Sequence, residues 1–253
     1  MSTDDYLRLL PKTELHGHFA STMSAAQLIA FADRESAELP TTDPALLFNF
    51  ADLADILEAF RAAHQVLTTA DDFARVAYDG VRAAVTAGSV RYREDAINPQ
   101  YFAPRGTSYR EILGPIIDGL RAAQADLGVG FRIVVAIHRH DSASDAVKLV
   151  ETMVANPLPK VVALGQDDLT PELTEDPARF TEAYALARRH GLLTTAHAGD
   201  EAIPAFGLEL EDVKHITLAG ITAAFRDEDE KASMRAQYTA EIAALDSALE
   251  PTE

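Results

Sequence analysis

The sequence has no cysteine, which excludes disulfide bonds and thiolate metal ligands. Any transition metal would therefore have to be bound by histidine and carboxylate side chains. Basic residues are scarce: 22 lysines and arginines stand against 40 aspartates and glutamates, for a formal net charge of -18. Because such a charge repels phosphate backbones and anionic lipids, we expect no nucleic-acid partner and no membrane partner.

Long hydrophobic runs are also missing. No segment has the roughly 18 consecutive apolar residues that a membrane span requires, and the opening MSTDDYLRLLPK lacks the apolar core of a signal peptide. We therefore expect a cytoplasmic protein. Hydrophobic residues make up 47% of the 253 positions, which is typical of a packed globular core, and the length fits one large α/β domain.

Apolar strand candidates alternate with amphipathic helix patterns over the first 200 residues. The strand candidates lie at 13–18, 90–97, 131–137, 160–165 and 192–197. Helix signals separate them, including a predicted N-cap at Ser24, a predicted capping box of Ser108 with Glu111, and predicted C-terminal caps at Gly88 and Gly128. This alternation is typical of right-handed βαβ units around a parallel sheet.

The alternation stops after residue 203. The stretches GLELEDVKHITLAGITAAF and DEDEKASMRAQYTAEIAALDSALE both have helical periodicity. The second places five residues in one apolar row: Met234, Tyr238, Ile242, Leu245 and Leu249. We therefore predict a single domain over 1–253, with five parallel strands in 1–203 and a C-terminal helical segment in 204–253.

Three histidines lie at the ends of strand candidates. The stretch TELHGHF places His16 and His18 two residues apart, so both face one side of a strand at the rim where parallel strands end. Alone, this pair also fits two ordinary polar strand residues. His197 ends the fifth strand candidate, and three neutral imidazoles at one rim suit Zn²⁺, which lowers the pKa of a bound water to about 7. In the turn that follows, the carboxyl group of Asp200 could protonate a substrate nitrogen.

The other histidines are weaker candidates. We expect solvent-exposed positions for the three in helical patterns, His64, His190 and His215. His138 and His140, at the end of the third strand candidate, are intermediate candidates for metal ligands.

Several aspartates have simple structural explanations. Helix capping accounts for Asp71, Asp72 and Asp176, with Pro177 at the first helical position. We expect Asp167 and Asp168, after the fourth strand, to be solvated loop residues, with substrate contact as the minor alternative.

The motifs LPKTELHGHF, VRYREDAINPQ, VVALG and TAHAGD, with the pair Arg139 and His140, occur in the order seen in the adenosine deaminase family. The chain resembles that family as far as about Asp200, and GLELEDVKHITLAGITAAF is similar to its C-terminal helices. The resemblance implies a metal-dependent amidohydrolase-like (β/α) barrel that holds one Zn²⁺ per chain. It also implies hydrolytic deamination of a purine nucleoside or a related amino-heterocycle.

The resemblance also suggests roles for residues. His16, His18 and His197 resemble the family's three zinc-binding histidines. Asp200 stands where the family has a glutamate that protonates the purine ring, and its shorter side chain misplaces the proton donor by about 1 Å, a shift that costs roughly 100-fold in rate. Ala20 replaces an acidic residue that the family uses for a sugar hydroxyl, and GQDDLTPE lacks the family's Ala-Gly-Asp-Glu turn. The substrate-binding residues remain unassigned.

The largest departure is a missing segment. Only six residues separate Asp200 from Gly207, where the family has three further βα units that carry a catalytic histidine and an adjacent aspartate pair, one of them a zinc ligand. Five strands cannot close an eight-stranded barrel, so we predict an incomplete TIM-barrel-like fold whose unpaired edges promote self-association. We expect weak or no turnover. The alternatives are a noncatalytic remnant that binds metal or nucleoside, and a divergent amidohydrolase with another substrate.

Overall fold

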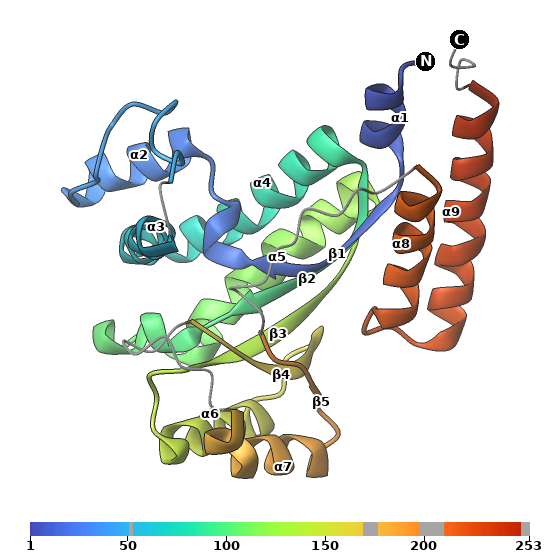
Figure 1. Cartoon of the computed structure of the whole chain (residues 1–253). Coiled ribbons are helices and arrows are strands. Elements are labelled where there is room, and N and C mark those ends of the chain that lie inside the picture. The colour runs from blue at the N-terminus through green and yellow to red at the C-terminus, as the bar shows by residue number, and fades with distance from the viewer. Residues whose placement is uncertain (51–52, 169–176, 198–209, 249–253) are drawn as a thin grey trace.

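The computed structural model describes residues 1–50, 53–168, 177–197 and 210–248. Within these ranges one parallel sheet has the strand order β1-β2-β3-β4-β5 (Figure 1). The strands are β1 (Lys12–His18), β2 (Val90–Ile97), β3 (Gly130–His138), β4 (Val161–Asp167) and β5 (Leu193–Thr194). All five predicted strands are confirmed. β5 is shorter than predicted, although the amides of Thr195 and His197 continue its pairing with β4 by donating to the carbonyls of Leu164 and Gln166.

Helices precede the first strand, connect successive strands and follow the last one. They are α1 (Thr3–Leu9), α2 (Ala25–Glu35), α3 (Leu53–Val66), α4 (Ala70–Gly88), α5 (Tyr109–Leu127), α6 (Ala143–Ala155), α7 (Thr181–Arg189), α8 (Leu210–Ala223) and α9 (Glu228–Ala248). Short 3₁₀ turns lie at η1 (Phe19–Thr22), η2 (Pro99–Tyr101), η3 (Ala103–Arg105) and η4 (Pro177–Phe180). None of the described helices is long and apolar enough to cross a membrane.

The helix caps follow the predicted side-chain chemistry. Ser24 caps α2, and Ser108 with Glu111 forms the capping box of α5. Gly128 ends α5 with φ of 72°, the left-handed conformation that glycine adopts without strain. The predicted cap at Gly88 is wrong by one residue, because α4 includes Gly88 and Ser89 takes the left-handed position.

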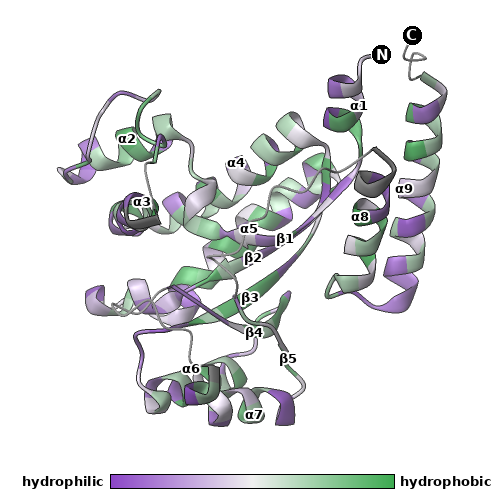
Figure 2. Cartoon of the chain, viewed as in Figure 1, coloured by the Kyte–Doolittle hydropathy of each residue, from purple (hydrophilic) through white to green (hydrophobic). Residues whose placement is uncertain are grey.

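Helices α4 to α7 cover one face of the sheet and form the main core (Figure 1). Buried side chains of β3 and β4, including Phe131, Val135 and Leu164, pack against them. In Figure 2 most of β3 is coloured as hydrophobic. Helices α4 and α5 cross so closely that a Cβ on Gly119 would lie 2.1 Å from the carbonyl oxygen of Ala74, so only glycine fits there.

The hairpin of α8 and α9 packs on the opposite face, which we call the inner face, near the N-terminal ends of the strands (Figure 1). The buried ring of Tyr92 contacts the apolar row predicted for α9, of which Met234, Tyr238 and Ile242 are all buried. The carboxylate of Glu94 accepts hydrogen bonds from the Tyr92 hydroxyl at 2.6 Å and from the amide of Phe225 at 2.5 Å. The hairpin is therefore fixed to β2 by both apolar and polar contacts.

The sheet is open, as predicted, because β1 and β5 each pair with a single neighbour among the described residues. Part of the β1 edge is covered by the hairpin: the Tyr238 hydroxyl donates to the carbonyl of Lys12 at 2.9 Å, and Gly220 packs against Thr13. Covering a strand edge in this way limits strand pairing with other chains. Self-association remains a prediction, as does the single domain. The predicted boundary between 203 and 204 lies outside the described residues.

Asp72 provides a test of the capping interpretation. Its carboxylate accepts two hydrogen bonds from Arg34 at 2.7 Å and one from the Thr69 amide at 2.9 Å. Burial by itself would raise the pKa of Asp72, but the hydrogen bonds from Arg34 and Thr69 lower it to about 2. The folded-state pKa lies below the unfolded-state value of 3.8, so this carboxylate stabilises the fold above pH 4 and the contribution is lost as the pH falls towards 2.

We expect Asp72→Asn to flatten the loss of thermal stability between pH 5 and pH 3, measured as the change in Tm. Asp71→Asn, at an exposed position of the same first turn, is the matched control. The interpretation fails if both variants keep the pH dependence of the parent protein. Asp176, the third predicted cap, lies outside the described residues.

Candidate metal centre

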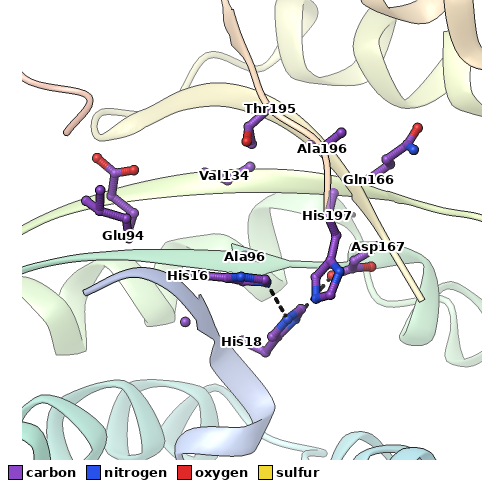
Figure 3. Close-up of a pocket in the computed structure, with 14 residues that line it drawn as sticks. His16, His18, Glu94, Ala96, Val134, Gln166, Asp167, Thr195, Ala196 and His197 are labelled. Carbon is purple, nitrogen blue, oxygen red and sulfur yellow. Dashed lines mark hydrogen bonds and ion pairs between the residues drawn. The ribbon is translucent and has the colours of Figure 1, made fainter. Parts of the chain in front are cut away.

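The three predicted histidines lie together at the carboxyl end of the sheet (Figure 3). One ring nitrogen of each of His16, His18 and His197 lies within 4.8 Å of the others. The Nε2 atoms of His16 and His18 are 3.1 Å apart, and the His197 ring centroid lies 4.3 Å from that of His16 and 5.3 Å from that of His18. The side chains from the first and last strands therefore converge as their spacing predicts.

Local backbone features bring the rings together. The register of β1 against β2 shifts between Glu14 and Gly17, immediately beside His16. A Cβ on Gly17 would lie 2.7 Å from Nη2 of Arg93 and 2.8 Å from Oδ1 of Asp95, so a larger residue would have to displace these two side chains. His197 is placed by the hydrogen bond from its amide to the carbonyl of Gln166 on β4.

A buried carboxylate supports His18. Oδ2 of Asp167 lies 3.2 Å from Nδ1 of His18, and the amide of Asn98 donates to Oδ1 of Asp167 at 2.5 Å. Burial would raise the pKa of Asp167, but the interactions with His18, Asn98 and His138 together outweigh burial and keep the pKa below its usual value. A carboxylate at Nδ1 fixes the tautomer of a histidine so that Nε2 faces a metal.

The prediction that Asp167 and Asp168 are solvated loop residues is wrong. Asp167 is the last residue of β4, where strand alternation turns its side chain to the inner face, and it is 3% exposed. The Asp168 side chain is 4% exposed. The sequence did indicate this position. Asp167 lies two residues after Gly165 and four after Ala163, so all three face the same inner side of β4.

The donor set fits zinc. Tetrahedral ligands at about 2.0 Å from Zn²⁺ lie about 3.3 Å from one another, close to the 3.1 Å between Nε2 of His16 and Nε2 of His18. Neutral imidazoles whose other ring nitrogen contacts a carboxylate are typical zinc ligands. Asp200, the predicted proton donor, lies outside the described residues.

A cavity of about 130 Å³ opens beside the three histidines on the inner face. Its walls include small residues from β1 to β4 and from the segment after β5: Gly17, Ala96, Ala136, Gly165 and Ala196. Glu94 contributes to the end of the cavity nearer the C-terminal hairpin, where burial raises the pKa of its carboxyl (Figure 3). The small side chains leave room for a flat ring next to the imidazole nitrogens.

A second group of polar side chains lies at the rim beside this cavity, and we call it the rim cluster: Tyr101, His138, His140 and Asp168. Nε2 of His138 and Nε2 of His140 lie 3.1 Å and 3.6 Å from Oδ2 of Asp168, and the Tyr101 hydroxyl donates to the same oxygen at 3.1 Å. The structure therefore joins the two intermediate histidine candidates through a carboxylate. Nothing in the sequence indicated a role in the site for Tyr101 or Asn98, apart from their position after the second strand.

The prediction of a solvent-exposed His64 is wrong. His64 is 4% exposed, its Nδ1 lies 2.8 Å from the Phe60 carbonyl, and its ring stacks on Tyr101 with centroids 4.0 Å apart. Burial lowers the pKa of His64 to about 4, so the ring is neutral at pH 7. His190 and His215 are exposed, as predicted.

Asp167→Asn is expected to weaken Zn²⁺ binding by about 10- to 100-fold, the usual cost of losing the carboxylate partner of a metal-binding histidine. Asparagine has nearly the same size, so the fold is retained while the charge at Nδ1 of His18 is lost. Zinc affinity is measured by competition with a coloured chelator. Asp145→Asn, on the exposed start of α6, is the control, and equal affinities in the two variants would contradict the role of Asp167.

Comparison with known proteins identifies relatives. The family model described as adenosine deaminase matches residues 11–206. The adenine deaminase of Streptomyces coelicolor is 33% identical over 213 residues, covering 83% of this chain and 61% of that protein. The adenine deaminase of Pseudomonas entomophila is 31% identical and covers 84% of this chain and 67% of that protein. The chain thus spans about three-fifths to two-thirds of the length of these curated relatives.

Solved structures show the same fold. An amidohydrolase from Burkholderia ambifaria with bound Zn matches 97% of this chain and 94% of that chain with a TM-score of 0.87, at 22% identity. The adenine deaminase of Arthrobacter aurescens matches 76% of this chain and 58% of that chain with a TM-score of 0.67, at 29% identity. The first match spans nearly the whole of both chains, so the two folds are alike over a similar length. On the family match over residues 11–206, the chain belongs to the adenosine deaminase family.

Proposed function

We propose that this chain binds one Zn²⁺ through His16, His18 and His197 and hydrolytically deaminates an amino-purine. The observation that carries the proposal is the convergence of the three ring nitrogens within 4.8 Å beside an open cavity. Membership of the adenosine deaminase family and the adenine deaminase activity named for its relatives support the same reaction.

The chain's own residues would hold the metal and the substrate in distinct ways. A zinc ion at this position would supply a water acidic enough to ionise near neutral pH. Asp167 holds His18 in the tautomer that presents Nε2. The small side chains at Ala96, Ala136 and Gly165 accept a flat heterocycle against the sheet. In the net reaction a C–O bond replaces the C–N bond at the amino-bearing carbon and ammonia leaves, with Asp200 proposed as the group that protonates the ring nitrogen.

We expect turnover to be slow. Asp167 contacts Nδ1 of His18, on the side of the ring away from Nε2, so it supports a ligand without adding a fourth one. A second candidate function, zinc or nucleoside binding without turnover, is supported by the coverage of only 61% of the Streptomyces coelicolor relative and by the open edge of β1.

The test measures zinc and ammonia on the same protein. After dialysis against zinc and then against metal-free buffer, metal content per chain is determined and ammonia release is followed with adenine and with adenosine. About one zinc per chain with ammonia release supports the deaminase. Zinc without ammonia release supports the binding function. If His197→Ala leaves the zinc content unchanged, both the deaminase and the binding function are contradicted, because in both His197 is a zinc ligand.

A further inference from the structure

His197 lies beyond the regular part of the edge strand. Regular pairing of β5 is limited to Leu193–Thr194, and within the described residues β4 is its single neighbour. His16 and His18, by contrast, belong to the seven-residue strand β1. Because a metal centre binds tightly only when its ligands are already held at the right separation, His197 needs support beyond the pairing of β5.

Both backbone groups of His197 are bound to neighbouring strands. Its amide donates to the carbonyl of Gln166 on β4 at 3.0 Å, and its carbonyl accepts a hydrogen bond from Nη2 of Arg139, the residue after β3. Two bonds on either side of one Cα atom fix the orientation of the backbone and therefore the direction in which the imidazole ring leaves it. The ring of His197 is thus aimed by β3 and β4 together.

Arg139 joins the ends of three strands and is itself only 2% exposed. Its Nη1 donates to the carbonyl of Asp168 at 2.5 Å, and its amide donates to the carbonyl of Asp167 at 3.0 Å. A guanidinium presents several N–H donors in a rigid plane, so it can bind two carbonyls at once, whereas the ammonium of a lysine is a single point on a flexible chain. The contacts of Arg139 therefore depend on the shape of its side chain as well as on its charge.

The same arginine contacts the strand end that supports His18. Asp168 has φ of 67°, a left-handed value that is uncommon for a residue other than glycine, and the bond from Arg139 holds its carbonyl in place. The preceding residue, Asp167, lies 3.2 Å from Nδ1 of His18. Uncommon backbone conformations held by their surroundings are typical of functional sites. Arg139 thus connects the strand end behind His18 with the backbone of His197.

We infer that Arg139 is a positioning residue of the metal centre: by donating to the carbonyls of Asp168 and His197, it places the His197 ring for the metal and thereby sets the zinc affinity of the chain. The inference rests on the proposed function for the identity of the metal, and it adds a residue that acts through the backbone of a ligand. Loss of the guanidinium is expected to weaken and distort the metal centre while the fold remains.

The test uses Arg139→Lys in the full chain, because lysine keeps the buried positive charge and most of the apolar stem but cannot bind both carbonyls as the guanidinium does. Zinc affinity is measured by competition with a coloured chelator, and the visible absorption of bound Co²⁺ reports the coordination geometry. We expect the zinc dissociation constant to rise about 10- to 100-fold, the usual cost of losing an outer partner of a metal ligand. The Co²⁺ spectrum should change, while the circular dichroism of the metal-free chain stays that of the parent.

Arg179→Lys is the matched control. Arg179 is exposed and donates to the carbonyl of Arg139 at 3.4 Å, so the same change is made beside the same residue without removing the bond to His197. Its zinc affinity and Co²⁺ spectrum are expected to match those of the parent. The inference is overturned if Arg139→Lys binds zinc as the parent does, if both variants lose affinity equally, or if Arg139→Lys has lost the circular dichroism of the parent. Failure of the proposed function shows separately: the parent chain then holds no zinc, or His197→Ala holds as much as the parent.

Discussion

His197→Ala is expected to lower the affinity of this chain for Zn²⁺ by on the order of 1,000-fold. Structural zinc sites contribute roughly 10–16 kcal/mol of binding free energy at pH 7, so one of three protein ligands accounts for about 4 kcal/mol. The substitution leaves the backbone in place, because the hydrogen bond to Gln166 comes from the amide of residue 197. The loss should therefore appear in metal affinity and not in folding.

The measurement is a competition titration with a chelator of known affinity, with circular dichroism as the check on folding. His190→Ala removes an exposed imidazole at the end of α7 and serves as the control, with an expected change of less than twofold. If His197→Ala and His190→Ala bind zinc equally well, the three-histidine centre is wrong.

Arg93→Ala is expected to lower the free energy of unfolding by about 3–5 kcal/mol, the usual cost of removing one partner of a buried ion pair. Nη2 of Arg93 lies 2.7 Å from Oδ1 of Asp95, and both side chains are 3% exposed. Burial raises the pKa of Asp95, and Arg93 is the group that opposes this rise most strongly. Without Arg93, the Asp95 carboxyl must either remain charged in the core or take up a proton, and both outcomes destabilise the native state.

Urea denaturation at pH 7 measures the change. The double variant Arg93→Leu with Asp95→Leu removes both charges and should recover much of the loss, since apolar pairs often replace buried ion pairs at little cost. A loss below about 1 kcal/mol in Arg93→Ala would show that the pair is not buried as described. Nε of Arg93 also lies 3.2 Å from Oε2 of Glu14, two residues before His16 of the candidate metal centre.

Strand prediction was most direct for the strands that pair on both sides. β2 matches its predicted range, and β3 and β4 differ from theirs by one or two residues at an end, because continuous apolar runs are typical of strands with two neighbours. Among the described residues β1 pairs only with β2, and it differs from its predicted range by one residue. β5 is an edge strand in the described sheet, with one neighbour to define its length, and only Leu193–Thr194 qualify. A hydrophobic run cannot indicate how far an edge strand stays paired.

The site was predictable where strand periodicity alone decides it. His16 and His18 share a face through their spacing, and His197 completes the group because it follows β5. Asp167 and His64 were missed because their surroundings come from distant parts of the chain. His64 is buried against Tyr101 from the segment after β2, and Asp167 meets His18 across the sheet. Sequence patterns report the element that holds a residue, and not the partner that covers it.

The hairpin on the inner face has a consequence for synthesis. Tyr92 and Glu94 on β2 are covered by side chains and backbone from residues 221–238, which leave the ribosome after all five strands. The sheet and the helices on its other face can therefore assemble during translation while this apolar surface is still uncovered. Protection of the nascent chain against aggregation is accordingly needed longest on the inner side, until the final helix has been made.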